Sequence, residues 1–296
     1  MNLPHLLPTT VVGSFPCVEI KGYHLDHYKK SIQFAVHEQI RAGVDIITDG
    51  QIRDDMVSLF LSKLPGISDN NVIGKIQAAD KHVNLKEICY ARLKNKYVKG
   101  NLTGPCTLAY ALQITTPMYR NKEEVIMDLA RALHIEAMHQ DAVGVSIIQV
   151  DEPILSTGAV PVETADKALK IIFEGIKADS CIHTCGILHD IADKWVKLPV
   201  DILDFEYAVS PENLETLGKQ DLNGKKIGCG CVQSSVQTVE SVDEIRKRIL
   251  ACVDVFGKEN VLVDPDCGLR MHTPEGAFAK LENMCKAAKM VREENL

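Results

Sequence analysis

The chain has 296 residues, of which 46% are hydrophobic and 25% are charged, the composition of an ordinary globular protein. Its formal net charge of -7 provides no positive field for nucleic acid or for an anionic membrane, and we expect neither partner. No apolar run approaches the roughly 20 residues of a membrane span, and the N-terminus lacks the pattern of a signal peptide. Most of the ten cysteines lie within apolar patterns, which favours reduced thiols and a cytoplasmic protein.

Short β-branched runs alternate with amphipathic stretches along the chain. Apolar residues at three- and four-residue spacing predict a helix within residues 22–44 and further helices over residues 122–143, 165–177 and 242–256. The predicted strands are residues 10–15, 45–48, 97–102, 146–150, 181–184, 201–205, 226–229 and 261–263. Eight strand-helix units imply parallel strands that close into a (β/α)8 TIM barrel, which we expect to form a single α/β domain over residues 1–296.

The alternative fold is a doubly wound open sheet. Against it, no Gly-x-Gly-x-x-Gly motif follows the first strand, where a dinucleotide-binding fold would place one. Residues 65–96 interrupt the strand-helix rhythm with two glycines and a polar run. We expect this segment to form a long excursion, an inserted hairpin or loop, after the second strand.

Chemically unusual residues follow nearly every predicted strand. In a barrel all strand ends of one polarity converge on a single rim, and active sites of this fold lie there. The rim segments are residues 13–16, 49–55, 103–105, 151–153, 183–185, 206–207, 228–231 and 264–267. The sequence therefore predicts one polar site assembled from all eight ends.

His183 and Cys185 are the strongest metal-ligand candidates. Side chains alternate along a strand, so a His-x-Cys pair presents both groups to one face. Imidazole and thiolate suit zinc, whereas soft sulfur ligands argue against magnesium and calcium. Glu206 and Cys267 are candidate partners, because a strand-end glutamate is costly to bury unpaired and Cys267 follows an Asp-Pro-Asp turn. Cys229 and Cys231 form a competing strand-end pair.

Other rim residues have both structural and functional interpretations. Asp151 is either a solvated turn residue or, because Pro153 fixes the backbone, a positioned carboxylate. Gly13 permits a ligand to approach the backbone beside Ser14. Trp195 is expected to pack in a helix. The remaining histidines of interest show no metal-like spacing with a soft ligand and are expected to be structural or exposed: His24, His27, His37, His134, His139 and His272.

Four motifs together resemble the catalytic domain of cobalamin-independent methionine synthase. They are residues 10–16 (TVVGSFP), residues 148–153 (IQVDEP), the His183-x-Cys185 pair and residues 263–269 (VDPDCGL), and the resemblance extends from about residue 9 to 290. The length suits the short, single-barrel form known from archaea and some anaerobic bacteria. The resemblance implies a cytoplasmic, zinc-dependent thiol methyltransferase that makes methionine from homocysteine.

The resemblance also implies roles for individual residues. The zinc ligands of the family fall on His183, Cys185, Glu206 and Cys267. The amino-acid part of homocysteine falls on Val12, Gly13, Ser14 and Asp151, and Asp151 would orient the substrate ammonium as the main catalytic carboxylate. A substrate-binding glutamate of the family is replaced near Gly50, where Asp49 or Gln51 is the candidate substitute.

Two further departures concern the methyl donor. The amino-terminal barrel of the long enzymes is missing, and so is the family's proton-donating histidine after the seventh strand, where Ser235 and its neighbours stand. Methyl-folate has a poor leaving group that needs protonation, whereas a methylcobamide does not. We therefore expect a methylcobamide donor, free or carried on a corrinoid protein.

Several alternatives remain open from the sequence. The donor is alternatively methyl-folate, or the acceptor is another small thiol such as a mercapto-sulfonate. A metal-free decarboxylase of the uroporphyrinogen type is a further possibility for such a barrel. A non-catalytic zinc- or corrinoid-binding barrel would instead have a closed four-ligand metal site.

Overall fold

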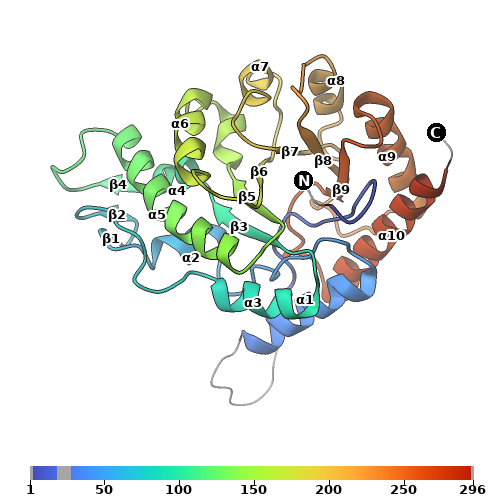
Figure 1. Ribbon diagram of the computed structural model, residues 1–296, viewed down its shortest axis with the longest axis horizontal. Helices are drawn as coiled ribbons and strands as arrows, with labels where there is room; N and C mark the ends of the chain where they lie inside the picture. Colours follow the sequence, from blue (N-terminus) through green and yellow to red (C-terminus); the bar gives the residue numbers. More distant parts are fainter. Residues whose placement is uncertain (1–2, 19–27, 295–296) are drawn as a thin grey trace.

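The computed structural model of the protein describes residues 3–18 and 28–294 and is built around a parallel sheet (Figure 1). The sheet has six strands in the order β3-β5-β6-β7-β8-β9. Its register pairs Asp151 with His183 and His183 with Asp204, so rim residues of successive strands lie at one level. The strands are β3 (Lys99–Thr103), β5 (Ile147–Asp151), β6 (Asp179–Thr184), β7 (Ile202–Glu206), β8 (Lys226–Val232) and β9 (Val261–Pro265).

Two short extended segments, at residues 9–10 and 46–47, add to the six strands and complete the eight-stranded barrel. Parallel bridges join Thr9 to Val263, Thr10 to Ile46, and Ile47 to Val98 beside β3. These bridges connect the two edges of the six-stranded sheet, as a (β/α)8 barrel requires. The predicted first strand, residues 10–15, is mostly irregular, because its backbone bonds to rim loops: Phe15 N–H donates to Gly50 O and Ser14 O accepts from Leu269 N–H.

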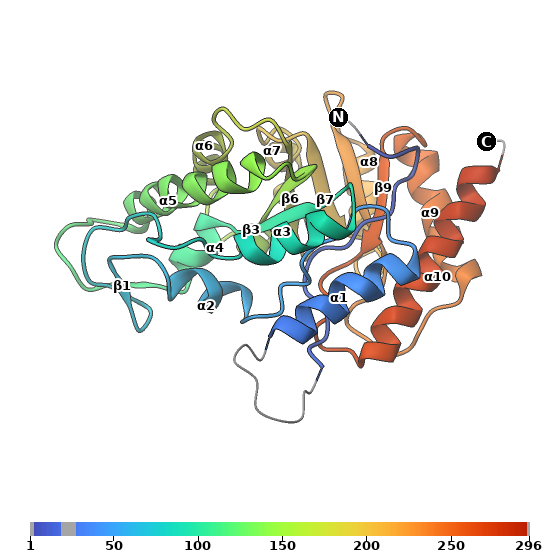
Figure 2. The ribbon, with the colours of Figure 1, turned by 60° about the horizontal axis from the view of Figure 1, so that its bottom comes forward.

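Helices surround the sheet (Figures 1 and 2). Those predicted from apolar spacing are observed with small changes at their ends, and the last of them begins with a capping box at Ser241 and Glu244. None of the helices in the described part of the chain is long and apolar enough to cross a membrane. The helices are α1 (Lys29–Ala42), α2 (Met56–Leu61), α3 (Leu85–Lys94), α4 (Pro105–Tyr110), α5 (Lys122–Ala142), α6 (Val162–Ile172), α7 (Ala192–Trp195), α8 (Glu212–Gly218), α9 (Val242–Phe256) and α10 (Pro274–Glu293), with a short 3-10 helix η1 (Pro153–Thr157).

The segment at residues 65–96 contains a short antiparallel hairpin followed by α3. The hairpin strands are β1 (Ile67–Ser68) and β2 (Asn71–Val72), and β2 also pairs in parallel with β4 (Gln113–Ile114). Between the hairpin and α3 the chain is attached to α5, where Asp128 pairs with Lys75. The excursion is thus attached to the barrel through α5.

The barrel interior changes character from one layer to the next. Ile46, Ile147, Cys181, Ile202 and Leu262 form a buried apolar cluster of their own, separate from the main core between sheet and helices. Two residues further along the strands, toward their carboxyl ends, the interior becomes polar. The apolar layer therefore forms the floor under the rim site.

Trp195 packs in the main core, as its sequence context predicts. Its side chain is fully buried, and the indole Nε1–H donates to Thr184 Oγ1 over 3.0 Å. This bond attaches α7 to the end of β6 one residue before Cys185. The tryptophan thereby supports the rim from the core side.

Candidate active site

Three predicted metal ligands converge at the carboxyl ends of β6 and β9. His183 Nε2 lies 2.9 Å from Cys185 Sγ, and Cys185 Sγ lies 3.4 Å from Cys267 Sγ. All three ligand atoms lie within 4.8 Å of one another. One imidazole nitrogen and two sulfurs form a donor set that suits zinc.

Asp204 fixes the orientation of the His183 ring. The two residues are neighbours in the β6-β7 ladder, and His183 Nδ1 lies 2.7 Å from Asp204 Oδ1. Burial alone would raise the pKa of Asp204, but His183 and Lys99 hold that pKa at about 2, so the carboxylate is charged. A charged acceptor at Nδ1 keeps the proton there and leaves Nε2 free to bind a metal.

A glycine in β8 makes room for this carboxylate. A Cβ atom on Gly228 would lie 2.8 Å from Asp204 Cγ, closer than side chains tolerate. Gly228 therefore has a packing role in the barrel interior. The adjacent Asp264 is fully buried, and burial together with the charge of Asp204 raises its pKa well above the ordinary value.

The two cysteines differ in their pKa. The hydrogen bond from Cys185, followed by the influence of His183, lowers the pKa of Cys267 below its ordinary value. The same hydrogen bond, with burial, raises the pKa of Cys185 above its ordinary value. A divalent cation bound between the two sulfurs would hold both as thiolates.

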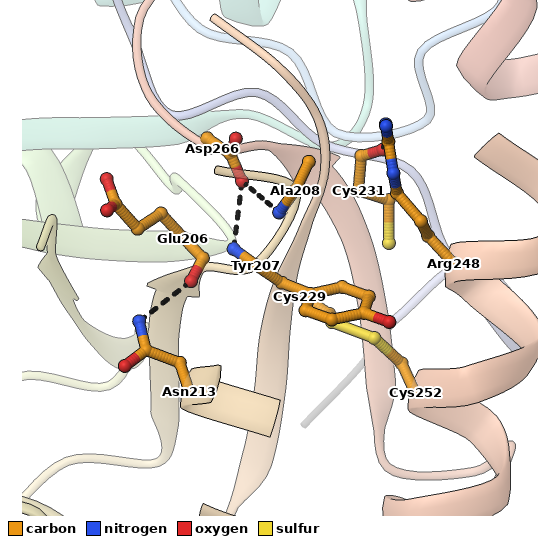
Figure 3. The surroundings of a disulfide bond; sticks show 9 residues. All are labelled: Glu206, Tyr207, Ala208, Asn213, Cys229, Cys231, Arg248, Cys252 and Asp266. Carbon is orange, nitrogen blue, oxygen red and sulfur yellow. Dashed lines mark hydrogen bonds between the residues drawn. A yellow bond between two sulfur atoms is a disulfide. The ribbon is translucent and has the colours of Figure 1, made fainter. Parts of the chain in front are cut away.

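Glu206, the fourth predicted ligand, does not join the cluster. Its Oε1 accepts a hydrogen bond from Ser210 Oγ over 2.5 Å, and Glu206 is absent from the group of close ligand atoms. Asn213 holds its backbone, because Asn213 Nδ2 donates to Glu206 O (Figure 3). The same nitrogen also donates to Gly186 O, next to Cys185 in the chain. Asn213 therefore connects the two loops that carry Cys185 and Glu206, a role the sequence did not indicate.

Asp266 is a structural residue of the rim. Its carboxylate accepts hydrogen bonds from the N–H groups of Tyr207, Ala208 and Val209, at 2.8 to 2.9 Å, and the first two are drawn in Figure 3. These bonds join the loop after β7 to the loop after β9, next to Cys267. The Asp-Pro-Asp turn thus positions Glu206 and Cys267 relative to each other.

A cavity of about 420 Å³ opens beside the sulfur cluster. The predicted substrate residues Val12, Ser14, Gln51 and Asp151 line it, together with His183, Cys185 and Cys267. The remaining lining residues come from the loop before α2, from α2 itself, from the start of η1 and from the loop after β9: Asp54, Asp55, Met56, Leu59, Pro153, Gly268, Arg270 and Met271.

Gly13 and Asp49 support this wall of the cavity. A Cβ on Gly13 would lie 2.4 Å from Gln51 Oε1, so glycine allows the Gln51 side chain to lie against the backbone. Asp49 is buried, and its Oδ1 accepts a hydrogen bond from Gln51 N–H. Of the two candidate substitutes for the family's glutamate, Gln51 lines the cavity and Asp49 shapes its turn.

Asp151 and Glu152, adjacent in sequence, have different environments. Burial raises the pKa of Asp151 to about 6, and its Oδ1 accepts a hydrogen bond from Gln149 Nε2 at the cavity wall. Glu152 points to α4 instead, where it accepts from Cys106 N–H and Thr107 N–H at the helix N-terminus. Asp151 is therefore the carboxylate available to a ligand.

The competing strand-end pair, Cys229 and Cys231, does not line the rim cavity; with Cys252 it forms a separate buried group whose sulfur atoms all lie within 4.8 Å of one another. Cys229 forms a disulfide with Cys252 of α9, and Cys231 is fully buried (Figure 3). The physical reason is the alternation of β8, in which Gly228 and Gly230 face Asp204 and Asp266. Cys229 and Cys231 consequently face the helix layer. The expectation that the cysteines are reduced thiols does not hold for Cys229 and Cys252, which form the disulfide.

A histidine does stand near the segment where the family's histidine is missing. His272, from the loop after β9, lies with Nε2 2.9 Å from Ser234 O. Its Nδ1 is buried and has no hydrogen-bond partner in the described part of the chain. His272 was expected to be structural or exposed because it shows no metal-like spacing with a soft ligand, and its separation of 38 residues from Ser234 gives no sign of this contact in the sequence. Ser235 itself is exposed.

Two basic residues, Arg270 and Lys99, also lie at or near the site. Arg270 borders the cavity and donates hydrogen bonds to Gln51 O and Asp54 O. Inside the barrel, Lys99 Nζ donates to Gln149 Oε1 over 2.5 Å, below Asp151. Neither basic residue was singled out in the sequence. His24 and His27 lie outside the described residues.

The fold is a (β/α)8 barrel that carries a candidate metal site, with a cavity beside it, at the carboxyl ends of its strands. Comparison with known proteins identifies the family. The family model "Cobalamin-independent synthase, Catalytic domain" matches residues 7–290. The chain therefore belongs to the cobalamin-independent methionine synthase family and is an enzyme of the methionine synthase type.

Relatives and solved structures agree with this assignment. The chain is 38% identical to a methionine synthase of Methanocaldococcus jannaschii, over 96% of this chain and 99% of that protein. It is 39% identical to a methionine synthase of Methanothermobacter marburgensis, over 95% and 98%. The B12-independent methionine synthase of Shewanella sp. W3-18-1, solved with selenomethionine, has the same fold, with a TM-score of 0.85, 23% identity and 98% coverage of both chains. A methyltransferase from Methanosarcina mazei has a TM-score of 0.69 at 14% identity, over 97% and 94%.

Proposed function

We propose that the protein transfers a methyl group from a methylcobamide to the thiol of homocysteine and so forms methionine, in the cytoplasm and with zinc at the rim. The observation that carries the proposal is the convergence of His183 Nε2 with the sulfurs of Cys185 and Cys267 beside the cavity. These donors fit zinc, with Glu206 as the proposed fourth ligand after a movement away from Ser210. When bound, zinc would lower the pKa of the substrate thiol and supply a positioned thiolate.

The cavity residues would orient homocysteine. The ionised Asp151 carboxylate is the proposed partner of the substrate ammonium group, with Gln51 and the backbone of residues 12–14 beside it. The apolar side chains of Met56 and Leu59 also line the cavity. This arrangement would present the substrate sulfur to the donor from the mouth of the cavity.

The donor is proposed from the chain's own chemistry. The thiolate forms the new S–CH3 bond, and the electron pair of the broken cobalt–carbon bond remains on the corrinoid, so no proton is needed for the leaving group. The loop after β8 supplies no histidine in residues 231–237. The family is described as cobalamin-independent, so a corrinoid donor, and any corrinoid protein that carries it, rests on this chain's residues alone.

One observation favours methyl-folate as the second candidate. His272 brings an imidazole next to Ser234, and its unpartnered Nδ1 could hold a proton for a folate leaving group. Methyl transfer to another small thiol is a third candidate, because Gln51 lines the cavity where the family places a glutamate.

Zinc content and donor preference test these proposals. Zinc-loaded protein should form methionine from homocysteine and methylcobalamin, and the Cys185→Ser variant should lose both zinc and activity. Turnover with methyl-folate that disappears in a His272→Ala variant would overturn the corrinoid donor. An active protein without zinc would overturn the zinc proposal.

A further inference from the structure

A second group of metal-ligand side chains lies outside the barrel, where the excursion meets α5. It consists of His82, on the loop before α3, with Glu136 and His139, one turn apart on α5. The two Nδ1 atoms of His82 and His139 lie 3.0 Å apart, and His139 Nδ1 lies 3.9 Å from Glu136 Oε2. All three ligand atoms lie within 4.8 Å of one another.

The spacing of these atoms suits one small cation. Ligand nitrogens at 2.0 to 2.1 Å from a tetrahedral zinc lie about 3.3 Å from each other. The observed separations of 3.0 and 3.9 Å lie on either side of this value. Two imidazoles with one carboxylate are typical ligands of zinc and related transition metals, and solvent at the exposed His82 can supply a fourth ligand.

The carboxylate is held in place for this role. Glu136 is buried, and its Oε1 accepts a hydrogen bond from Val83 N–H over 3.0 Å. This bond leaves Oε2 directed to His139 and fixes the residue next to His82. Ligands oriented in this way by backbone groups are a common property of metal sites.

We propose that His82, Glu136 and His139 form a second divalent transition-metal site, of the zinc class, that fastens the excursion to α5. The site differs from the rim cluster in position and in its lack of sulfur. Its effect extends toward the cavity, because Val83 O accepts from Lys63 Nζ, just beyond α2, and Met56 and Leu59 of α2 line the cavity. A bound ion would thereby stabilise the wall formed by α2.

Metal stoichiometry tests the site independently of the reaction. After zinc loading and removal of free metal, the His82→Ala and Glu136→Gln variants should each hold about one ion fewer per chain than the wild-type protein. His82 is exposed, so its replacement leaves the core intact, and the glutamine retains an acceptor for Val83 N–H. His37→Ala is the matched control, because the His37 side chain is 73% exposed and lies outside the cluster.

Cobalt substitution separates the two sites. Of the two proposed sites only the rim site contains cysteine, so thiolate-to-cobalt absorption should persist in His82→Ala and disappear in Cys267→Ser, while the second ion remains in Cys267→Ser. Unchanged stoichiometry in both His82→Ala and Glu136→Gln would overturn the proposal and leave the two imidazoles as a hydrogen-bonded pair.

Discussion

Replacing Asp204 with asparagine should weaken zinc binding at the rim without unfolding the protein. The carboxylate accepts the Nδ1 proton of His183 over 2.7 Å and is charged, since its pKa is held at about 2. The amide has the same shape but no charge, so the ring loses its charge-assisted partner. Removal of such partners costs about 10- to 100-fold in metal affinity, or about 1.4 to 2.7 kcal/mol.

A competition titration against a chromophoric zinc chelator measures this loss. Asp201→Asn is the matched control, because Asp201 lies at the opposite end of β7 and accepts from Ser180 N–H and Oγ–H, far from the sulfur cluster. Thermal unfolding of both variants would show that the barrel remains folded. Zinc affinity equal to wild type in folded Asp204→Asn would refute the argument that this carboxylate orients His183.

Three further predictions concern the rim and the core. Cys267→Ser should lose rim zinc whereas the exposed Cys17→Ser should retain it, by metal analysis, and equal retention would contradict the ligand assignment. Gly13→Ala should lower kcat/KM for homocysteine about 10- to 100-fold, since the new Cβ displaces Gln51, and unchanged kinetics would contradict this. Glu240→Gln should lower the free energy of unfolding by about 3 to 5 kcal/mol, because it leaves the buried Lys280 ammonium uncompensated. Burial alone would raise the pKa of Glu240, but Lys280 holds it below its ordinary value, so this stabilisation should be full near neutral pH and be lost in acid as the pH falls through the folded-state pKa. Denaturant unfolding at several pH values checks both statements, and a constant difference between wild type and variant down to acid pH would contradict them.

The strand-helix rhythm predicted the barrel and most of its strands because alternation and helical spacing report buried faces directly. It overestimated the first strand, whose backbone groups bond to rim loops at Gly50 and Leu269. Such bonds join positions far apart in the sequence, and periodicity carries no information about them. The strand ends, together with the family resemblance, predicted a cluster of His183, Cys185, Glu206 and Cys267, and the structure brings all of these but Glu206 together.

The supporting residues could not be predicted in the same way. Asp204 orients His183 from a neighbouring strand, and Asn213 and His272 act across loops. The orientation of Cys229 and Cys231 could not be predicted either, because a Cys-x-Cys spacing shows that two side chains share a face of a strand but not which face. The glycines at alternate positions of β8, which face the interior, were the signal that could have resolved it.

The corrinoid donor and the rim zinc are tested together by the rate of methionine formation by the zinc-loaded protein from homocysteine, with methylcobalamin or methyl-folate as donor. We expect turnover with methylcobalamin, little with the folate, and loss of turnover in Cys267→Ser. Turnover with methyl-folate alone would contradict the corrinoid donor.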